Sequence, residues 1–215
     1  MRVIAGSAGG IRLAVPKRGV RPTMDRVKAA IFSSLGDVVI GARVLDLFAG
    51  SGALGIEALS RGASSAVFVE EDAQSAKILE GNLAKTKLHG RVRQQDVFDF
   101  LRNAASAETF HIIFADPPYE RTKSGEPFTE KLLGNEVLPR LLGPNGIFVL
   151  EKRPGQALPE MRQWHGIRQR TYGATEVLFL SAMPNPEHEV RGRLRVDGKA
   201  DRPSDREIGS QSAIK

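Results

Sequence analysis

The sequence predicts an α/β protein built on a doubly wound, mostly parallel sheet of about seven strands. Five short segments rich in Val, Ile and Phe alternate with helix-length stretches, which is typical of strands that helices return to one parallel sheet. A Gly-x-Gly-x-x-Gly turn directly follows the first of these segments. Two further segments joined at Gly173 predict an antiparallel hairpin at one end of the sheet.

We place the strands by their apolar runs and the helices by the stretches between them. The strands are expected at 43–46, 66–70, 91–95, 111–115 and 146–150, with the end hairpin at 167–172 and 175–181. The helices between them are expected at 52–61, 73–85, 97–103 and 129–142.

Two elements are predicted ahead of the sheet. Residues 2–5 and 11–15 flank a glycine-rich turn and predict an N-terminal β-hairpin. Apolar residues spaced three or four apart from Val27 to Leu35 predict a helix, with Thr23 as its cap.

Composition divides the chain of 215 residues into three regions. With 41% hydrophobic residues the chain can bury one substantial core, so one main domain is expected at 29–183. Residues 1–28 form a basic hairpin and linker that extend this domain. Residues 184–215 hold no Phe, Trp or Tyr and mix both signs of charge, so a disordered tail is predicted there.

The net charge of +6 is spread unevenly along the chain. Residues 1–28 hold seven Lys and Arg against one acid, whereas 29–183 hold 17 against 18 and 184–215 hold seven against six. A basic leading segment favours a polyanionic partner, because Lys and Arg near phosphates release counterions. A solvated basic face explains the same charges equally well.

Several kinds of site are excluded by composition. The chain has no cysteine, which rules out disulfides and thiolate metal sites, and its four histidines are too scattered to predict a metal centre. The longest apolar runs are strand-sized, and the N-terminus has no apolar signal-peptide core. We therefore expect no bound metal, no membrane partner and a cytoplasmic protein.

The turn after the first strand is a candidate cofactor site. Gly50, Gly52 and Gly55 let the backbone approach a ligand at the N-terminus of the following helix. Glu70 ends the next strand, 20 residues after Gly50, where its carboxylate can accept both hydroxyl hydrogens of a ribose. A nucleoside-type cofactor is predicted. A dinucleotide satisfies this pattern equally, and a structural turn is the alternative without function.

Two acidic residues bear on which cofactor binds. A carboxylate at Asp46, the tip of the first strand, would repel a pyrophosphate but favour a cationic sulfonium and an amino group, unless it is buried and paired. Asp96, after the third strand, can accept a hydrogen bond from an adenine amino group, with Val97 and Phe98 beside the ring. A role for Asp96 as a helix cap is equally consistent with the sequence.

The segment Asp116-Pro117-Pro118-Tyr119 ends the fourth strand. The first and fourth strands should be neighbours where the strand order reverses, so both tips would meet one crevice. Asp116 and the carbonyl oxygen of Pro117 can each accept one hydrogen of an exocyclic amine and aim its lone pair at a methyl donor. Tyr119 can stack on the base. A plain strand-ending turn is the alternative.

Residues 1–183 resemble, in chain order, the RsmD family of bacterial small-subunit rRNA methyltransferases, which modify the exocyclic N2 amine of one guanine in 16S rRNA. The motifs that carry the resemblance are Arg-Val-Ile-Ala-Gly at 2–6, Arg-Pro-Thr-Met-Asp-Arg-Val at 21–27, the glycine-turn segment at 45–62 and Asp-Pro-Pro-Tyr at 116–119. Asp-Pro-Pro-Tyr alone is shared with other amino methyltransferases. The stretch 21–27 narrows the match.

The resemblance implies a class I methyltransferase fold, of the Rossmann-like type, with S-adenosylmethionine as donor. It implies that the acceptor is 16S rRNA within the small ribosomal subunit or its assembly intermediate. The implied cofactor residues are Asp46, Phe48, Gly50, Ser51, Gly52, Glu70, Glu71, Asp96 and Val97. The implied catalytic residues are Asp116, Pro117 and Tyr119, and the implied RNA-contacting residues are Arg2, Arg12, Arg18, Arg21, Thr23 and Arg26. The region 184–215 has no counterpart in the family pattern.

Three rival functions remain at this point. An adenine-N6 DNA methyltransferase would use residues 116–119 equally well, but residues 1–42 and the short loops leave little material for target recognition. A nucleotide-binding oxidoreductase accounts for the glycine turn and Glu70 but leaves 116–119 unexplained. A non-catalytic RNA-binding factor accounts only for the basic start. We expect the protein to act as a monomer.

Overall fold

The structure is a computed structural model that describes residues 1–16, 24–104, 108–118 and 127–183. Met1–Met183 form one compact unit. The predicted tail at 184–215 lies outside the described residues, as does Thr23, the predicted helix cap. Within the described residues, no helix is long and apolar enough to span a bilayer.

A seven-stranded sheet forms the centre of the unit, in the order β3-β2-β1-β4-β5-β7-β6. The strands are β1 (Arg43–Leu47), β2 (Ser65–Glu70), β3 (Arg91–Gln94), β4 (Phe110–Ala115), β5 (Leu142–Lys152), β6 (Trp164–Tyr172) and β7 (Thr175–Ala182). The first five strands pair in parallel, and β7 pairs antiparallel with both β5 and β6. The predicted doubly wound sheet with an antiparallel end hairpin is confirmed.

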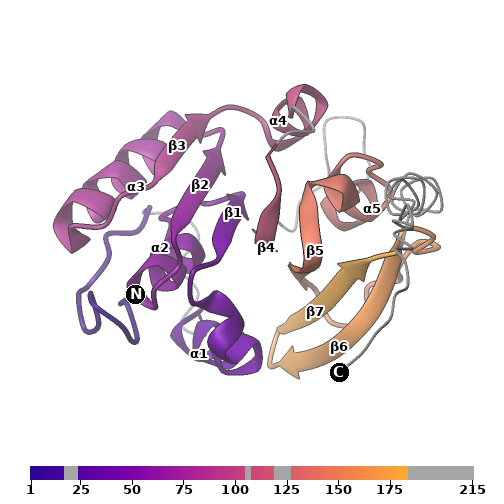
Figure 1. Ribbon diagram of the computed structural model, residues 1–215, viewed down its shortest axis with the longest axis horizontal. Helices are drawn as coiled ribbons and strands as arrows, with labels where there is room; N and C mark the ends of the chain where they lie inside the picture. The colour runs from indigo at the N-terminus through magenta and orange to yellow at the C-terminus, as the bar shows by residue number, and fades with distance from the viewer. Residues whose placement is uncertain (17–23, 105–107, 119–126, 184–215) are drawn as a thin grey trace, which may run out of the picture. The chain divides into compact units, whose positions relative to one another are not determined.

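Helices cover both faces of the sheet (Figure 1). They are α1 (Met24–Leu35), α2 (Ala53–Ser60), α3 (Ala73–Thr86), α4 (Val97–Asn103) and α5 (Phe128–Leu133), with 3₁₀ turns η1 (Gly36–Val39) and η2 (Leu138–Leu141). Helices α1, α2 and α3 pack in one core with Val44 and Phe68, whereas α4 and α5 pack in a second core with Leu45 and Val67. Successive strand residues therefore face opposite cores, which explains the near-continuous apolar runs.

One predicted helix is wrong in length. The segment 129–142 was expected to be a single helix, but α5 ends at Leu133 and the chain turns at Gly134. The side chain of Asn135 then accepts hydrogen bonds from the N–H groups of Val137 (3.0 Å) and Leu138 (2.9 Å), which starts the separate turn η2. A local amide acceptor thus competes with the helical hydrogen bonds.

The predicted N-terminal hairpin takes a minimal form. It has one antiparallel bridge, between Arg2 and Arg12, instead of two regular strands. Backbone hydrogen bonds from Val3 N to Ile11 O (2.9 Å) and from Leu13 N to Met1 O (3.0 Å) flank this bridge. The short pairing is sufficient because contacts with α2 hold the segment in place.

Glu57 of α2 makes those contacts. Its fully buried carboxylate accepts hydrogen bonds from the N–H groups of Ile4 (2.7 Å) and Ala5 (3.1 Å). It also pairs with Nζ of Lys28 (3.2 Å) and Nε of Arg61 (2.7 Å). One carboxylate therefore joins the N-terminal segment, α1 and α2, and its charge is compensated by two cations.

Replacing Lys28 with Met should lower the free energy of unfolding by about 3–5 kcal/mol, because the buried Glu57 loses its buried cationic partner. Burial lowers the pKa of Lys28, and the negative charge of Glu57 opposes that shift. Urea denaturation measures the change. The control is Arg91→Ala, which removes an exposed pair with Glu108 and should cost about 0–1 kcal/mol. Equal costs for the two variants would contradict the role given to Glu57.

Candidate active site

The carboxyl ends of β1, β2 and β4 meet at one edge of the sheet. The register places Leu47 beside both Val69 and Ala115, so the residues that follow these three lie in one row. The strand order reverses between β1 and β4, which is the usual position of a ligand crevice in such sheets. The candidate cofactor residues Phe48 and Glu70 therefore lie beside Asp116 at this edge.

The turn after β1 has three residues with left-handed backbone. The φ angles are 58° at Phe48, 54° at Gly50 and 79° at Gly52. A Cβ added at Gly52 would lie 2.1 Å from Cδ1 of Leu79, so a larger residue there would collide with the core. A Cβ at Gly50 would meet only the carbonyl oxygen of Phe48, at 4.0 Å, so Gly50 faces open space. Space above a backbone that is held in place is what a bound nucleoside needs.

Glu70 holds this turn from the tip of β2. Its carboxylate accepts hydrogen bonds from Gly50 N (2.7 Å) and Asp72 N (2.8 Å), one at each oxygen. Burial raises the pKa of Glu70, against the effect of these two bonds. Each carboxylate oxygen can accept more than one hydrogen bond, so both oxygens keep capacity for ribose hydroxyls.

Asp46 is a buried acid in β1. Its Oδ2 accepts a hydrogen bond from Gly55 N (2.8 Å). Burial raises the pKa of Asp46 to about 8, the negative charges of Asp116 and Glu70 add to the shift, and the bond from Gly55 opposes it. Asp46 is therefore buried, which was the alternative to a role in choosing the cofactor. The acids around it still favour a cation at this edge of the sheet. This group of hydrogen-bond acceptors fits a sulfonium nucleoside and disfavours a pyrophosphate.

Asp96 caps α4. Its Oδ1 accepts hydrogen bonds from Phe98 N (2.8 Å) and Asp99 N (2.9 Å). The helix-cap alternative is therefore realised, and the capping oxygen leaves Oδ2 as the acceptor that an adenine amino group would use. Val97 is buried directly after the cap.

Two contacts at this edge were missed from the sequence. The ring of Phe128, the first residue of α5, lies 5.3 Å from that of Phe48 and 6.1 Å from that of Phe98, measured between centroids. The buried amide of Asn82 donates to the carbonyl oxygens of Ser51 (2.9 Å) and Ala14 (2.9 Å). Single apolar or amide residues in helix-like segments gave no sequence signal for either contact.

The remaining predicted residues divide into three groups. Asp116 is partly buried and Pro117 is buried, at the end of β4, while Ser51 is buried inside the glycine turn. The exposed residues are Arg2, Arg12, Arg26 and Glu71. Three predicted RNA-contacting residues, Arg18, Arg21 and Thr23, and one catalytic residue, Tyr119, lie outside the described residues.

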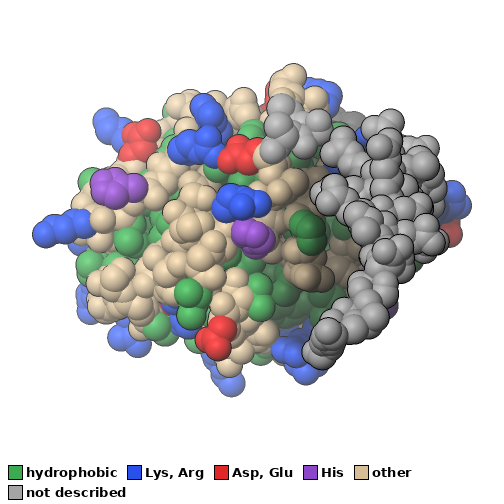
Figure 2. Space-filling model, viewed as in Figure 1, with side chains coloured by type: hydrophobic (Ala, Val, Ile, Leu, Met, Phe, Trp, Pro, Cys, Tyr) green, Lys and Arg blue, Asp and Glu red, His purple; other side chains and the backbone are tan. Residues whose placement is uncertain are grey.

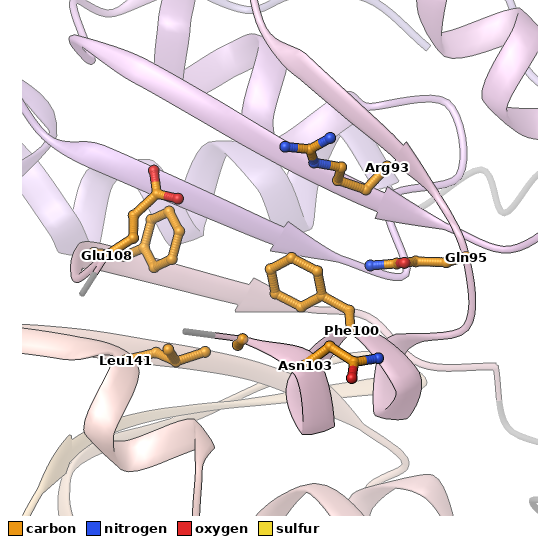
Figure 3. Close-up of a pocket in the computed structure, with 8 residues that line it drawn as sticks. Arg93, Gln95, Phe100, Asn103, Glu108 and Leu141 are labelled. Carbon is orange, nitrogen blue, oxygen red and sulfur yellow. The ribbon is translucent and has the colours of Figure 1, made fainter. Parts of the chain in front are cut away.

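A separate pocket of about 280 Å³ lies between β3 and α4 (Figure 3). It is lined by Arg93, Gln95, Phe100, Asn103, Ala104, Glu108, Phe110 and Leu141. None of the predicted cofactor or catalytic residues lines it, so this pocket is distinct from the candidate site at the sheet edge. Among the described residues, no three His, Cys, Asp or Glu side chains are grouped as a metal site requires.

Charges on the face shown in Figure 2 are mixed. Among the described residues that are visible there, Lys and Arg side chains are scattered between acidic and uncharged ones.

Comparison with known proteins places this geometry in a family. A family model described as "Conserved hypothetical protein 95" matches residues 1–181. The chain belongs to this family. Among its relatives, YlbH of Bacillus subtilis is 42% identical to this chain over 182 residues, which cover 82% of this chain and 96% of YlbH. Ribosomal RNA small subunit methyltransferase D of Haemophilus influenzae is 33% identical over 177 residues, covering 80% and 89%.

A solved structure supports the same assignment. The structure of YhhF from Escherichia coli superposes with a TM-score of 0.73 at 31% identity, covering 85% of this chain and 97% of that chain. The expected class I methyltransferase fold is confirmed, and so is the resemblance to the RsmD family.

The two central glycines should respond differently to alanine. Gly50→Ala should cost only about 1 kcal/mol of stability, from its left-handed backbone, but should block nucleoside binding because the methyl group enters the open space. Gly52→Ala should destabilise the protein more, because its methyl group meets Leu79. Thermal melts and S-adenosylmethionine titration of both variants separate the effects. Unimpaired binding by a folded Gly50→Ala variant would contradict the assigned cradle.

Asp46 should make stability depend on pH. Its pKa is raised on folding, so its contribution to stability is complete below about pH 4 and is lost as the pH rises through about 8. The loss can reach about 1.4 kcal/mol per pH unit in that window. Urea denaturation of the free protein at pH 5 and pH 8 measures it, and Asp46→Asn should flatten the dependence. An equally steep dependence in Asp46→Asn would assign it to other groups.

Proposed function

We propose that this protein transfers a methyl group from S-adenosylmethionine to the exocyclic N2 amine of one guanine in 16S rRNA of the small ribosomal subunit. The observation that carries the proposal is the position of Asp116 and Pro117 at the same edge of the sheet as Asp46 and Glu70. Family membership and the relatives named for small-subunit rRNA methylation support the acceptor.

S-adenosylmethionine is the cofactor, and the acidic residues at this edge of the sheet fit it. Glu70 would accept the ribose hydroxyls, Asp96 the adenine amino group, and Asp46 the cationic end. When bound, this cofactor supplies an electrophilic methyl group on a sulfonium. Burial raises the pKa of Asp46 to about 8 in the free protein, and a bound cation would stabilise its ionised form. The backbone of the turn is already held by the hydrogen bond from Gly50 N to Glu70.

Asp116, Pro117 and Tyr119 would act on the acceptor. An exocyclic amine is a weak nucleophile because its lone pair is delocalised into the ring. Asp116 and the carbonyl oxygen of Pro117 would each accept one amine hydrogen, which pyramidalises the nitrogen and directs its lone pair. Proline offers no N–H that would compete for these acceptors. Tyr119 would stack on the base, and positioning would supply most of the rate.

The guanine must leave its stack for the N2 amine to reach the crevice. The exposed Arg2, Arg12 and Arg26 would hold the RNA backbone, with Arg18, Arg21 and Thr23 close to them in sequence. Such contacts fix position without reading sequence, so the shape of the rRNA would supply much of the selection.

Adenine-N6 methylation of DNA is the second candidate, since Asp116 and Pro117 would serve that amine equally well. The oxidoreductase alternative conflicts with the acidic crevice and with family membership. Action on the small subunit or its assembly intermediate, as a monomer, remains a prediction.

The acceptor is tested by transfer of labelled methyl groups from S-adenosylmethionine to unmodified small subunits, free 16S rRNA and duplex DNA in parallel. Nucleoside analysis identifies the product. N2-methylguanine from rRNA or subunits supports the proposal and reports the preferred form of the substrate. N6-methyladenine would transfer support to the second candidate.

Asp116→Ala should lower methyl transfer by about 10²–10³-fold, because the amine loses an acceptor needed in the transition state. Cofactor affinity should be nearly unchanged, since the proposed partner of Asp116 is the target amine. Asp99→Ala, which removes an acid paired with Arg102 on α4, is the control and should keep full activity. Loss of cofactor binding in Asp116→Ala would indicate a structural role instead.

A further inference from the structure

The edge strand β6 carries positive charge that the sequence analysis did not assign. Its residues from His165 to Thr171 are all exposed, so no described helix covers either face of this part of the strand. The strand itself holds two arginines, Arg168 and Arg170, and no acid, whereas Arg162 just before it is paired with Glu160. An exposed strand of this kind presents its side chains directly to a partner.

The hairpin of β6 and β7 turns at the catalytic edge of the sheet. Ala115 at the end of β4 pairs with Leu150 of β5, Leu150 with Leu178 of β7, and Leu178 with Gln169 of β6. Asp116 comes one residue further along, directly after the end of β4, and Arg170 occupies the matching position on β6. Neighbouring strands lie about 4.8 Å apart, so three steps separate the two backbones by about 14 Å. A few nucleotides of an extended strand cover that span.

Arg168 and Arg170 lie on one face of β6. They pair with Phe179 and Val177 of β7, and directly opposed residues of an antiparallel pair share a face. Phe179 and Val177 belong to the core that contains α1. Figure 1 shows α1 beside the end of this hairpin. The two arginines therefore lie on the same side of the sheet as α1, which carries the exposed Arg26.

The acid that faces β6 from the neighbouring strand β7 is paired with a cation. Glu176 stands opposite Thr171, but it forms a buried ion pair with Lys152. On the other edge strand, β3, Arg91 pairs with Glu108. The two edge strands thus differ, although both carry arginines. Strand β6 reaches the sheet edge where β4 ends, and it contains no acid.

We propose that β6 is a phosphate-binding edge, on which Arg168 and Arg170 bind the RNA backbone that flanks the target base. This inference rests on the proposed RNA substrate. Arginine suits the role because its planar guanidinium can donate two hydrogen bonds to one phosphate. The N-terminal segment and β6 would then hold the substrate at two places around the crevice.

The test compares two matched double variants of the full chain. Arg168→Gln with Arg170→Gln removes two charges from edge strand β6, and Arg91→Gln with Arg93→Gln removes two from edge strand β3. The affinity of each for a short labelled single-stranded RNA is measured over a salt series. The β6 variant should bind about tenfold or more weakly, and the slope of log K against log salt should fall by about 1.4, the value for two lost phosphate contacts. The β3 variant should match the wild type.

Cofactor affinity and thermal melting should be unchanged in both variants, and for methyl transfer the β6 variant should raise KM without lowering kcat. Equal losses in the two variants, or an unchanged salt slope in the β6 variant, would overturn the inference. Weaker action on ribosomal particles with unchanged binding of free RNA would also overturn it, by assigning β6 to a protein partner. If the wild type methylates no RNA, the proposed function fails whatever the binding data for β6 show.

Discussion

The glycine turn after β1 is the constraint on which the rest of the site depends. Three of its residues adopt left-handed backbone, including the non-glycine Phe48. Such a turn costs conformational energy and persists only where its surroundings fix it. Two buried acids do so: Glu70 accepts from Gly50 N and Asp46 accepts from Gly55 N. The turn thereby ties the tips of β1 and β2 to the start of α2. Helix α2 in turn presents Glu57, which anchors the N-terminal segment.

This arrangement sets stability against binding. Asp46, Glu70 and Asp116 lie close enough for their charges to interact, and burial raises the pKa of both Asp46 and Glu70. Concentrating acids at a sheet edge destabilises the free protein, but it creates a strong preference for a cationic ligand. The compensated carboxylate of Glu57 shows the contrasting solution: it has two cations of its own and serves structure alone.

The parts of the fold that sequence predicted are those with local signals. The alternation of strand-sized and helix-length segments located the strands, and the glycine spacing located the turn. Predictions failed where a single side chain decides between structures. Asn135 ends the expected helix at 129–142 by accepting two backbone hydrogen bonds, and no periodic pattern shows that. Asp96 could be a cap or an adenine acceptor, and only its geometry shows that one oxygen caps α4. The contacts of Asn82 and Phe128 join distant segments, which sequence spacing cannot reveal.

The distribution of charge along the sequence differs from its distribution on the folded protein. Along the sequence, residues 29–183 are nearly neutral and the excess positive charge lies in residues 1–28. Folding pairs many of those charges, as Lys152 with Glu176 and Arg91 with Glu108 show, and it leaves Arg168 and Arg170 of β6 exposed. If the substrate is RNA with an extruded base, contacts with the backbone that flanks the base would fix its position, because phosphate contacts set register and orientation. Under the proposal made for β6, its arginines would bind the RNA backbone at a second place, in addition to the N-terminal segment, within the same compact unit.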